Sequence, residues 1–225
     1  FGGLDLYKIS DDYCNPLIYA ADKPYLVSGG VDSLLSIIDT QYFAAKRPLF
    51  LFLTDETNRE LTNTLIPQLG ITQGKWQLIS QGKIKTGDLI IKEPRIYFKM
   101  LSPVKYLVKA ENINGPFWLV FSETFHSQWK VFPLAKNEYL SPGSGFNAFD
   151  LRFLFRKPFD IPHYVGNGYC NAWRIDLPKS GIGEDLYLEI YFLPQSFFYA
   201  GLFMSGFILT ICMSFLVLIL LRRRR

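Results

Sequence analysis

The chain has 225 residues, of which 49% are apolar and 20% are charged, so it has enough apolar residues for a hydrophobic core and is not a disordered sequence. It holds 24 Lys and Arg against 20 Asp and Glu, and the formal net charge of +4 matches the four arginines that end the chain. The body is therefore neutral, which excludes nucleic acid as an expected partner.

Residues 1–74 show a mixed pattern that predicts a small α/β unit. A strand-like PYLV (residues 24–27) precedes a helix-like segment over residues 32–45, whose apolar positions fall on one face. A continuous apolar run, LFLFL (residues 49–53), has the length of a buried strand, and a polar helix follows it and ends near Gly70. Alternation of strands and helices is typical of α/β folds.

The hexapeptide SGGVDS runs from Ser28 to Ser33, between the first of these strands and the first helix. It resembles the phosphate loop of the ATP pyrophosphatases, in which backbone N–H groups and a helix N-terminus hold phosphate. The α/β alternation stops near Gly74, however, and nothing downstream supplies the remaining strands of that fold. We therefore expect a turn that leads into a helix capped by Asp32, with a nucleotide site as a remote alternative.

Residues 75–196 lose the helical period. Short runs rich in aromatic and β-branched residues alternate there with turn signals such as Asn114-Gly115-Pro116. The expected strands are WQLIS, DLIIK, RIYFKML, VKYLVKA, FWLVFSE, WKVF, LRFLFR, PHYV, NAWRI and DLYLEIYF. Because no helices separate them, this region predicts an antiparallel β-sandwich, and the whole chain an α+β fold.

Residues 197–221 are 25 consecutive residues without a charge or a proline. At about 1.5 Å per residue, a helix of this length exceeds the ~30 Å hydrocarbon core of a bilayer. We therefore expect one C-terminal transmembrane helix, so that the chain is a single-pass membrane protein.

The charges on either side of this span predict its orientation. Residues 222–225 are basic, whereas acidic residues precede the span. The positive-inside rule places the C-terminus in the cytoplasm and residues 1–196 outside it, in a periplasmic, extracellular or lumenal space. The cytoplasmic basic stop consists of Arg222, Arg223, Arg224 and Arg225.

The span also carries small residues on which another helix could pack. Gly201 and Ser205 lie four residues apart, and Gly206 follows them. The chain begins at Phe1 without a signal peptide, so for an exported body we expect either a cleaved signal or a longer polypeptide with further spans. The expected partners are the lipid bilayer and other transmembrane helices or subunits.

Residues that could carry chemistry are few. Cys14 and Cys170, the two cysteines before the span, form either one disulfide or two buried thiols. His126 and His163 have no cysteine or histidine at metal-ligand spacing, and no G-x-S-x-G elbow surrounds Ser122. We therefore expect no catalytic residue, no metal and no cofactor in this chain.

Two later stretches carry a family resemblance. Residues 116–130 read PFWLVFSETFHSQWK, residues 167–173 read NGYCNAW, and a Pro194-Gln195 step precedes the last helix. In this order they resemble the C-terminal part of YfhO-like and GT-C-type glycosyltransferases, which are polytopic membrane proteins with an extracytoplasmic β-rich domain. The matching positions include Phe121, Ser122, Glu123, Trp129, Asn167, Gly168, Tyr169, Asn171 and Trp173.

The resemblance implies a non-catalytic part of such a protein. Transferases of this kind take a sugar from a polyprenyl-phosphate donor, and their catalytic acid lies in an earlier loop that these residues do not contain. We expect an extracytoplasmic, cell-envelope domain for glycan or protein contact. The alternative from another class is a single-span structural subunit of a membrane complex.

The matched residues also have a purely structural interpretation, which we favour over a glycan site. Residues 122–129 can turn between two strands with Phe121 and Trp129 packed inward, and NGYCNAW can form a tight turn whose Asn side chains bond local backbone. Core packing is likewise expected for the tryptophans, with sugar stacking as the alternative. These are Trp76, Trp118, Trp129 and Trp173.

Overall fold

The computed structural model describes residues 15–21, 24–27, 49–58, 77–80, 83–86, 94–141, 148–176 and 183–223. The fold is mixed α+β, with antiparallel sheets and one long C-terminal helix, which confirms the expected class. The described residues form two compact units. Unit 1 takes those within Phe1–Phe98, Lys109–Ser127 and Asp160–Leu186, and unit 2 those within Lys99–Val108, Gln128–Phe159 and Tyr187–Arg225.

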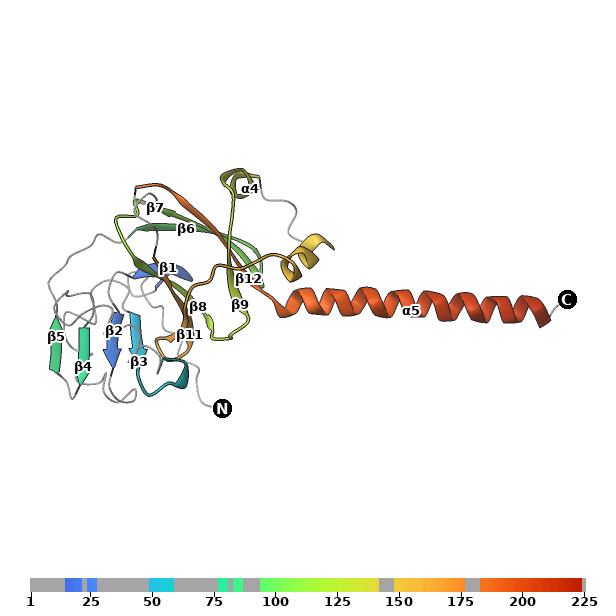
Figure 1. Cartoon of the computed structure of the whole chain (residues 1–225), viewed down its shortest axis with the longest axis horizontal. Coiled ribbons are helices and arrows are strands. Elements are labelled where there is room, and N and C mark those ends of the chain that lie inside the picture. Colours follow the sequence, from blue (N-terminus) through green and yellow to red (C-terminus); the bar gives the residue numbers. More distant parts are fainter. Residues whose placement is uncertain are drawn as a thin grey trace, which may run out of the picture. The chain divides into compact units, whose positions relative to one another are not determined.

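A small, partly parallel sheet in unit 1 has the strand order β3-β2-β4-β5 (Figure 1). Strand β2 (Pro24–Val27) pairs in parallel with β3 (Leu49–Phe52) and with β4 (Gln77–Ser80), and β4 pairs antiparallel with β5 (Lys83–Thr86). The apolar sequence of β3 fits this place, because strands of parallel sheets are covered on both faces. The sheet extends past the boundary expected at residue 74, since β4 and β5 complete it.

Several expectations for this region fall on residues that are not described. They are the helices over residues 32–45 and up to Gly70, the hexapeptide from Ser28 to Ser33, and the run DLIIK. The short 3-10 helix η2 (Glu56–Asn58) follows β3 directly.

The second sheet of unit 1 has the order β1-β8-β11-β10 and is antiparallel throughout. It consists of β1 (Ile18–Ala21), β8 (Phe117–Thr124), β11 (Cys170–Ile175) and β10 (His163–Gly166). Residues of both sheets share one core, which contains Tyr19, Leu26, Leu49, Trp118, Val120, Tyr164, Cys170 and Ala172 among others. The early strand β1 therefore joins strands that lie far along the chain.

Unit 2 is built on the sheet β6-β7-β12-β9. Its strands are β6 (Arg95–Ser102), β7 (Lys105–Glu111), β12 (Leu186–Phe192) and β9 (Trp129–Pro133), and the first residues of β6 and the last of β7 fall in unit 1. Strands β12 and β9 pair antiparallel. The short helix α4 (Lys136–Leu140) follows β9.

The run LRFLFR, expected as a strand, is not one. Most of it lies in the 3-10 helix η4 (Ala148–Leu154), and this prediction was wrong. Its alternating apolar and basic residues match a strand period, but the helical turn places Arg152 and Arg156 on the same carboxylate of Glu189, as described below.

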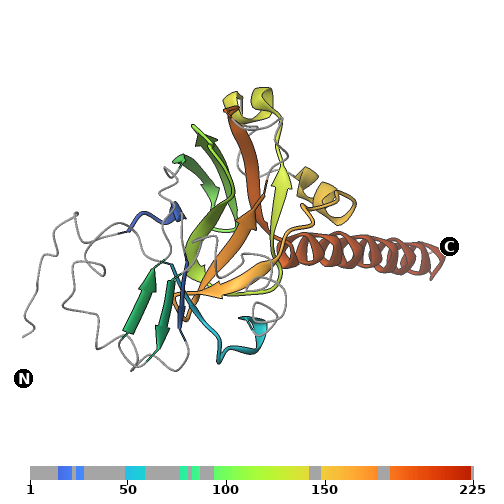
Figure 2. The same ribbon diagram turned by 60° about the vertical axis from the view of Figure 1, so that its left-hand side comes forward.

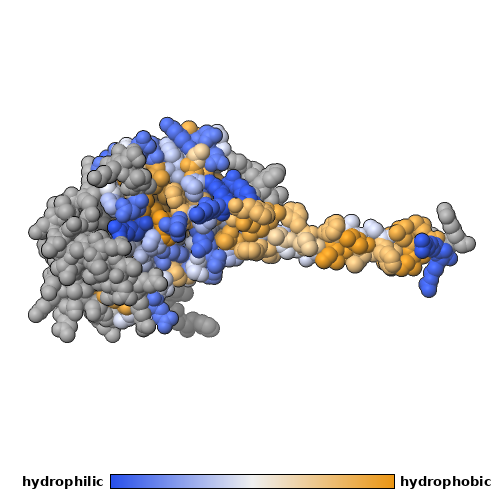
Figure 3. Space-filling view, viewed as in Figure 1, coloured by the Kyte–Doolittle hydropathy of each residue, from blue (hydrophilic) through white to orange (hydrophobic). Residues whose placement is uncertain are grey.

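Helix α5 (Pro194–Arg223) closes the chain and contains the whole charge-free stretch. It is the one helix within the described ranges that is long and apolar enough to cross a membrane, and none of its most apolar window is buried. Figure 3 shows apolar surface along the helix and a hydrophilic end at Arg222 and Arg223. Pro194 begins the helix, as proline commonly does at a first helical position.

Candidate functional site

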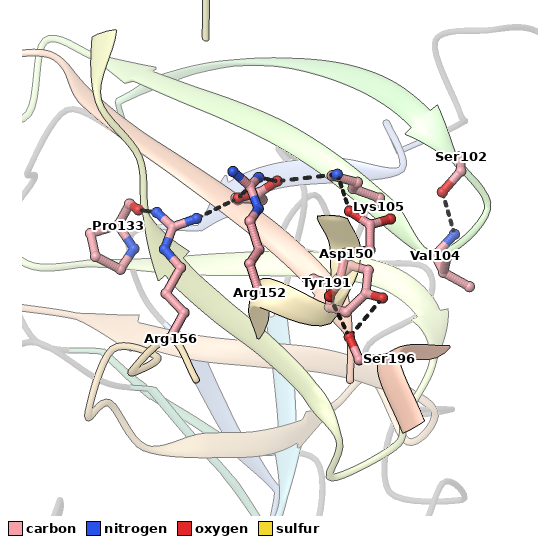
Figure 4. Close-up of polar contacts among 10 residues, drawn as sticks. Ser102, Val104, Lys105, Pro133, Asp150, Arg152, Arg156, Tyr191 and Ser196 are labelled. Carbon is pink, nitrogen blue, oxygen red and sulfur yellow. Dashed lines mark hydrogen bonds and ion pairs between the residues drawn. The ribbon is translucent and has the colours of Figure 1, made fainter. Parts of the chain in front are cut away.

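A network of buried charges lies in unit 2, next to the start of α5 (Figure 4). Lys105 of β7 donates to Asp150 of η4, with 2.6 Å between Nζ and Oδ1. Arg156 donates to Glu189 of β12, with 2.8 Å between Nη1 and Oε2, and Nη2 of Arg152 lies 3.2 and 3.3 Å from the two oxygens of Glu189. Lys105 Nζ is also 3.9 Å from Oε1 of Glu189, which links the two pairs.

Burial makes these pairs interdependent. The Lys105, Asp150 and Glu189 side chains are only 6%, 7% and 1% exposed. A charge removed from water this completely persists only when it is paired and hydrogen-bonded. Three cations share two carboxylates here, so positive charge is in excess, and the side chain of Arg152, at 43%, is the most exposed cation of the network.

Aromatic rings surround the network. Phe153 of η4 stacks on Tyr191 with ring centroids 3.9 Å apart, and Phe132 of β9 lies 5.0 Å from Phe153. The cations of Lys105 and Arg152 lie over the Phe153 ring, at 5.4 and 4.9 Å from its centroid. The rings exclude water and also attract the cations through their π faces.

The same residues bind the start of helix α5. The hydroxyl of Ser196, in the first turn of α5, donates to the Asp150 carbonyl oxygen at 2.7 Å and lies 3.0 Å from the hydroxyl of Tyr191. Burial raises the pKa of Tyr191 to about 12, so its phenol stays neutral at physiological pH. Helix α5 is thus bonded to η4 and β12 at its first turn.

The residues that carry the family resemblance lie on β8 and at the start of β9, and in the turn before β11 and on β11. Phe121 is fully buried on β8, and Trp129 and Trp173 are nearly so, as is Trp118. Core packing therefore accounts for these three tryptophans, while Trp76 lies outside the described residues. Ser122 and Glu123 are partly exposed, and residues 125–128 connect β8 to β9 as expected.

Asn171 connects β11 to the end of β8. Its Nδ2 donates to the carbonyl oxygens of Glu123 and Thr124 at 2.8 and 3.3 Å, and its Oδ1 accepts from the backbone N–H of His126 at 3.2 Å. Its Oδ1 also lies 3.0 Å from Nε2 of His163. These bonds satisfy the strand end beside the irregularity between Cys170 and Asn171.

Asn167 and Gly168 form the expected tight turn between β10 and β11. Both have positive φ, 52° and 79°, and the N–H of Tyr169 donates to the Gly166 carbonyl at 3.0 Å, as in an Asn-Gly hairpin turn. The exposed ring of Tyr169 follows.

The expectation that the motif asparagines bond local backbone was wrong. Asn167 Oδ1 accepts from the N–H of Phe50 at 2.8 Å, its own N–H donates to the Phe50 carbonyl at 2.7 Å, and Nδ2 donates to the Tyr19 hydroxyl at 3.1 Å. The turn is tight enough that the asparagine reaches the neighbouring strand β3 instead.

Asn58 makes a second connection of this kind, between β3 and β10, and no local sequence pattern distinguishes it. Its side chain is fully buried, and Nδ2 donates to the carbonyl oxygens of Phe52 and Val165 at 3.1 and 2.9 Å. Its Oδ1 accepts from the N–H of Val165 at 3.1 Å. Asn58 and Asn167 thus join the two sheets of unit 1, where a Cβ on Gly166 would lie 2.8 Å from Leu49 Cδ1.

The described residues do not build a metal site. No three His, Cys, Asp or Glu side chains lie together so as to hold an ion within the part of the chain that the structure describes. The chain matches no family model, no curated protein and no solved structure. The resemblance to the YfhO-like transferases stays a prediction.

Cys170 is buried and forms no bridge to another described residue, and Cys14 lies outside the described residues, so both the bridge and the pair of buried thiols stay predictions. Burial raises the pKa of the Cys170 thiol from 9.0 to about 12. We expect maleimide to label Cys170 only after unfolding, because the thiolate is the reactive form. The neutral thiol contributes stability below pH 9.0 that is lost as the pH rises toward 12.

Mass spectrometry checks this prediction. The chain is treated with maleimide in the folded and in the denatured state, each with and without reductant. Labelling of Cys170 after denaturation alone identifies a free thiol, and labelling only after reduction identifies a disulfide. Rapid labelling in the folded chain would contradict the burial.

Proposed function

We propose that this chain is a non-catalytic, membrane-anchored domain that holds a β-rich surface outside the cytoplasm, as part of a glycosyltransferase-like membrane protein. The observation that carries the proposal is the junction, within unit 2, of the sheet with α5. The ion pairs of Lys105, Asp150 and Glu189 and the bonds of Ser196 fix the sheet to an apolar helix. Charges paired in this way position a domain.

The surface would contact a glycan or another protein close to the bilayer. The resemblance of the motif residues to transferase domains supports a glycan as the contact. The connection of β12 to α5 through Leu193, with no linker, supports a location next to the membrane.

A single-span subunit of a larger complex is the second candidate function. Nothing lies within 4 Å of a Cβ placed on Gly201 or Gly206, so small residues of α5 are open to a neighbouring helix. Gly206 is one end of a row with Thr210 and Ser214, spaced four residues apart, and their hydroxyls bond the carbonyls one turn earlier. The mass of the native polypeptide separates the candidates, because a transferase requires further spans upstream and a subunit does not.

Labelling of cysteines from one side of the membrane tests the orientation. We expect an impermeant maleimide to label Lys136→Cys, an exposed position in α4, in intact cells, and to label a cysteine appended after Arg225 only after permeabilisation. Both variants carry Cys14→Ser and Cys212→Ser, so that the buried Cys170 is the one other cysteine. The reverse pattern would place the body in the cytosol, overturn the proposal and revive the nucleotide alternative.

A further inference from the structure

Phe155 follows η4 directly and is 89% exposed, more than any other large apolar side chain among the described residues. A backbone bond holds it in a turn, with its N–H donating to the Arg152 carbonyl at 3.1 Å. A phenylalanine ring held in water at a fixed place is unfavourable unless a partner covers it.

The place of this ring points to the partner. Residues of η4 bond the first turn of α5, through Asp150 and Ser196, and Phe153 stacks on Tyr191 beside Leu193. In both ribbon views the gold ribbon of η4 lies beside the start of α5 (Figures 1 and 2). Because the charge-free stretch begins at residue 197, the segment after η4 lies at the level where α5 enters a bilayer.

The charges around Phe155 fit the same partner. Arg152 and Lys157 are exposed on either side of it, and the buried network beside them carries an excess of positive charge. An aromatic ring flanked by basic side chains is typical of segments that rest in a membrane interface, where the cations meet lipid phosphates.

We propose that residues 152–157, the interfacial shoulder, lie in the surface of the same bilayer that α5 crosses. Phe155 inserts among the upper acyl chains, and Arg152 and Lys157 bind the phosphates of anionic lipids. This inference rests on the membrane anchoring in the proposed function but not on its sidedness or on its transferase assignment. The shoulder gives unit 2 a second contact with the membrane.

Nitroxide quenching in nanodiscs tests the shoulder in the full chain. A nitrobenzoxadiazole fluorophore is attached to Phe155→Cys in a Cys14→Ser, Cys212→Ser background, and lipids with a nitroxide at the top of the acyl chain are added. The matched control is Leu140→Cys in α4 of the same unit, an apolar position that is 62% exposed. We expect quenching at position 155 to be several-fold stronger than at position 140, and equal quenching would overturn the inference.

A label on the native Cys212, within the span, separates this result from a failure of anchoring. Lipids with the nitroxide deep in the acyl chain should quench it if α5 crosses the bilayer. Quenching at Cys212 without quenching at position 155 overturns the shoulder alone, and no quenching at either overturns anchoring and shoulder together. We also expect anionic lipid to strengthen the quenching at position 155. Lys157→Gln should reduce this increase in quenching. An increase that is the same with and without Lys157→Gln would overturn the assignment of Lys157 to lipid phosphate.

Discussion

Replacing Lys105 with methionine is expected to lower the free energy of unfolding of unit 2 by about 3–5 kcal/mol, because it leaves the buried carboxylate of Asp150 without its cation. The methylene stem of lysine is retained in methionine, so packing changes little. Loss of the charge also weakens the contact with Glu189, at 3.9 Å from Lys105 Nζ. Urea unfolding of the full chain in detergent micelles, followed by tryptophan fluorescence, measures the change.

Lys109→Met is the matched control on the same strand. Lys109 also forms ion pairs, with Asp185 at 3.0 Å and with Glu111, but its partners are far more exposed than Asp150 and Glu189. We expect only a small fraction of the cost, since water screens exposed pairs. Equal losses in the two variants would show that burial of the network contributes nothing.

A double variant tests the cause of the loss. Lys105→Met combined with Asp150→Asn removes both charges of the pair, and we expect it to recover much of the stability that Lys105→Met alone loses. A double variant as unstable as the single one would assign the loss to packing around Phe153 and would contradict the electrostatic account.

Replacing Asn58 with aspartate is expected to destabilise unit 1 by about 3–5 kcal/mol at neutral pH, because a buried, uncompensated charge replaces a neutral amide. The amide donates to the carbonyl oxygens of Phe52 and Val165, whereas a carboxylate would place a third acceptor oxygen against these two. The pKa of the new carboxyl should rise, since burial and acceptor neighbours disfavour its charge.

The cost of Asn58→Asp should therefore depend on pH. It should be largest well above about pH 4, where the unfolded aspartate is ionised, and should shrink as the pH falls and the protonated carboxyl donates again. The control is Asn114→Asp at an exposed position, where we expect little change. The free energy of unfolding, measured across this pH range, tests the prediction. A loss of stability that does not depend on pH would contradict it.

The sequence was sufficient for the parts of the fold that local patterns determine. The charge-free run predicted α5, the short runs rich in aromatic and β-branched residues predicted β7, β8, β11 and β12, and Asn167-Gly168 predicted the turn between β10 and β11. Each of these depends on residues that are neighbours along the chain.

The ion network could not be predicted, because its members come from three distant segments. Glu189 is 1% exposed, and two arginines reach its carboxylate, Arg152 from η4 and Arg156 from the turn that follows η4. The same arginines caused the wrong strand prediction for LRFLFR. Asn58 was missed for a similar reason, since its partner Val165 is 107 residues away.

Ser196 bonds the first turn of α5 to η4 and β12, so the thickness of the membrane would affect the orientation of unit 2. At about 1.5 Å per residue, the charge-free stretch of α5 is longer than a bilayer core of ~30 Å, so in the proposed membrane-anchored state we expect the helix to tilt, and to tilt less in a thicker membrane. Since no linker separates α5 from β12, unit 2 turns with the helix. A lipid composition that changes the bilayer thickness would thereby change the angle between the exposed surface of unit 2 and the membrane plane.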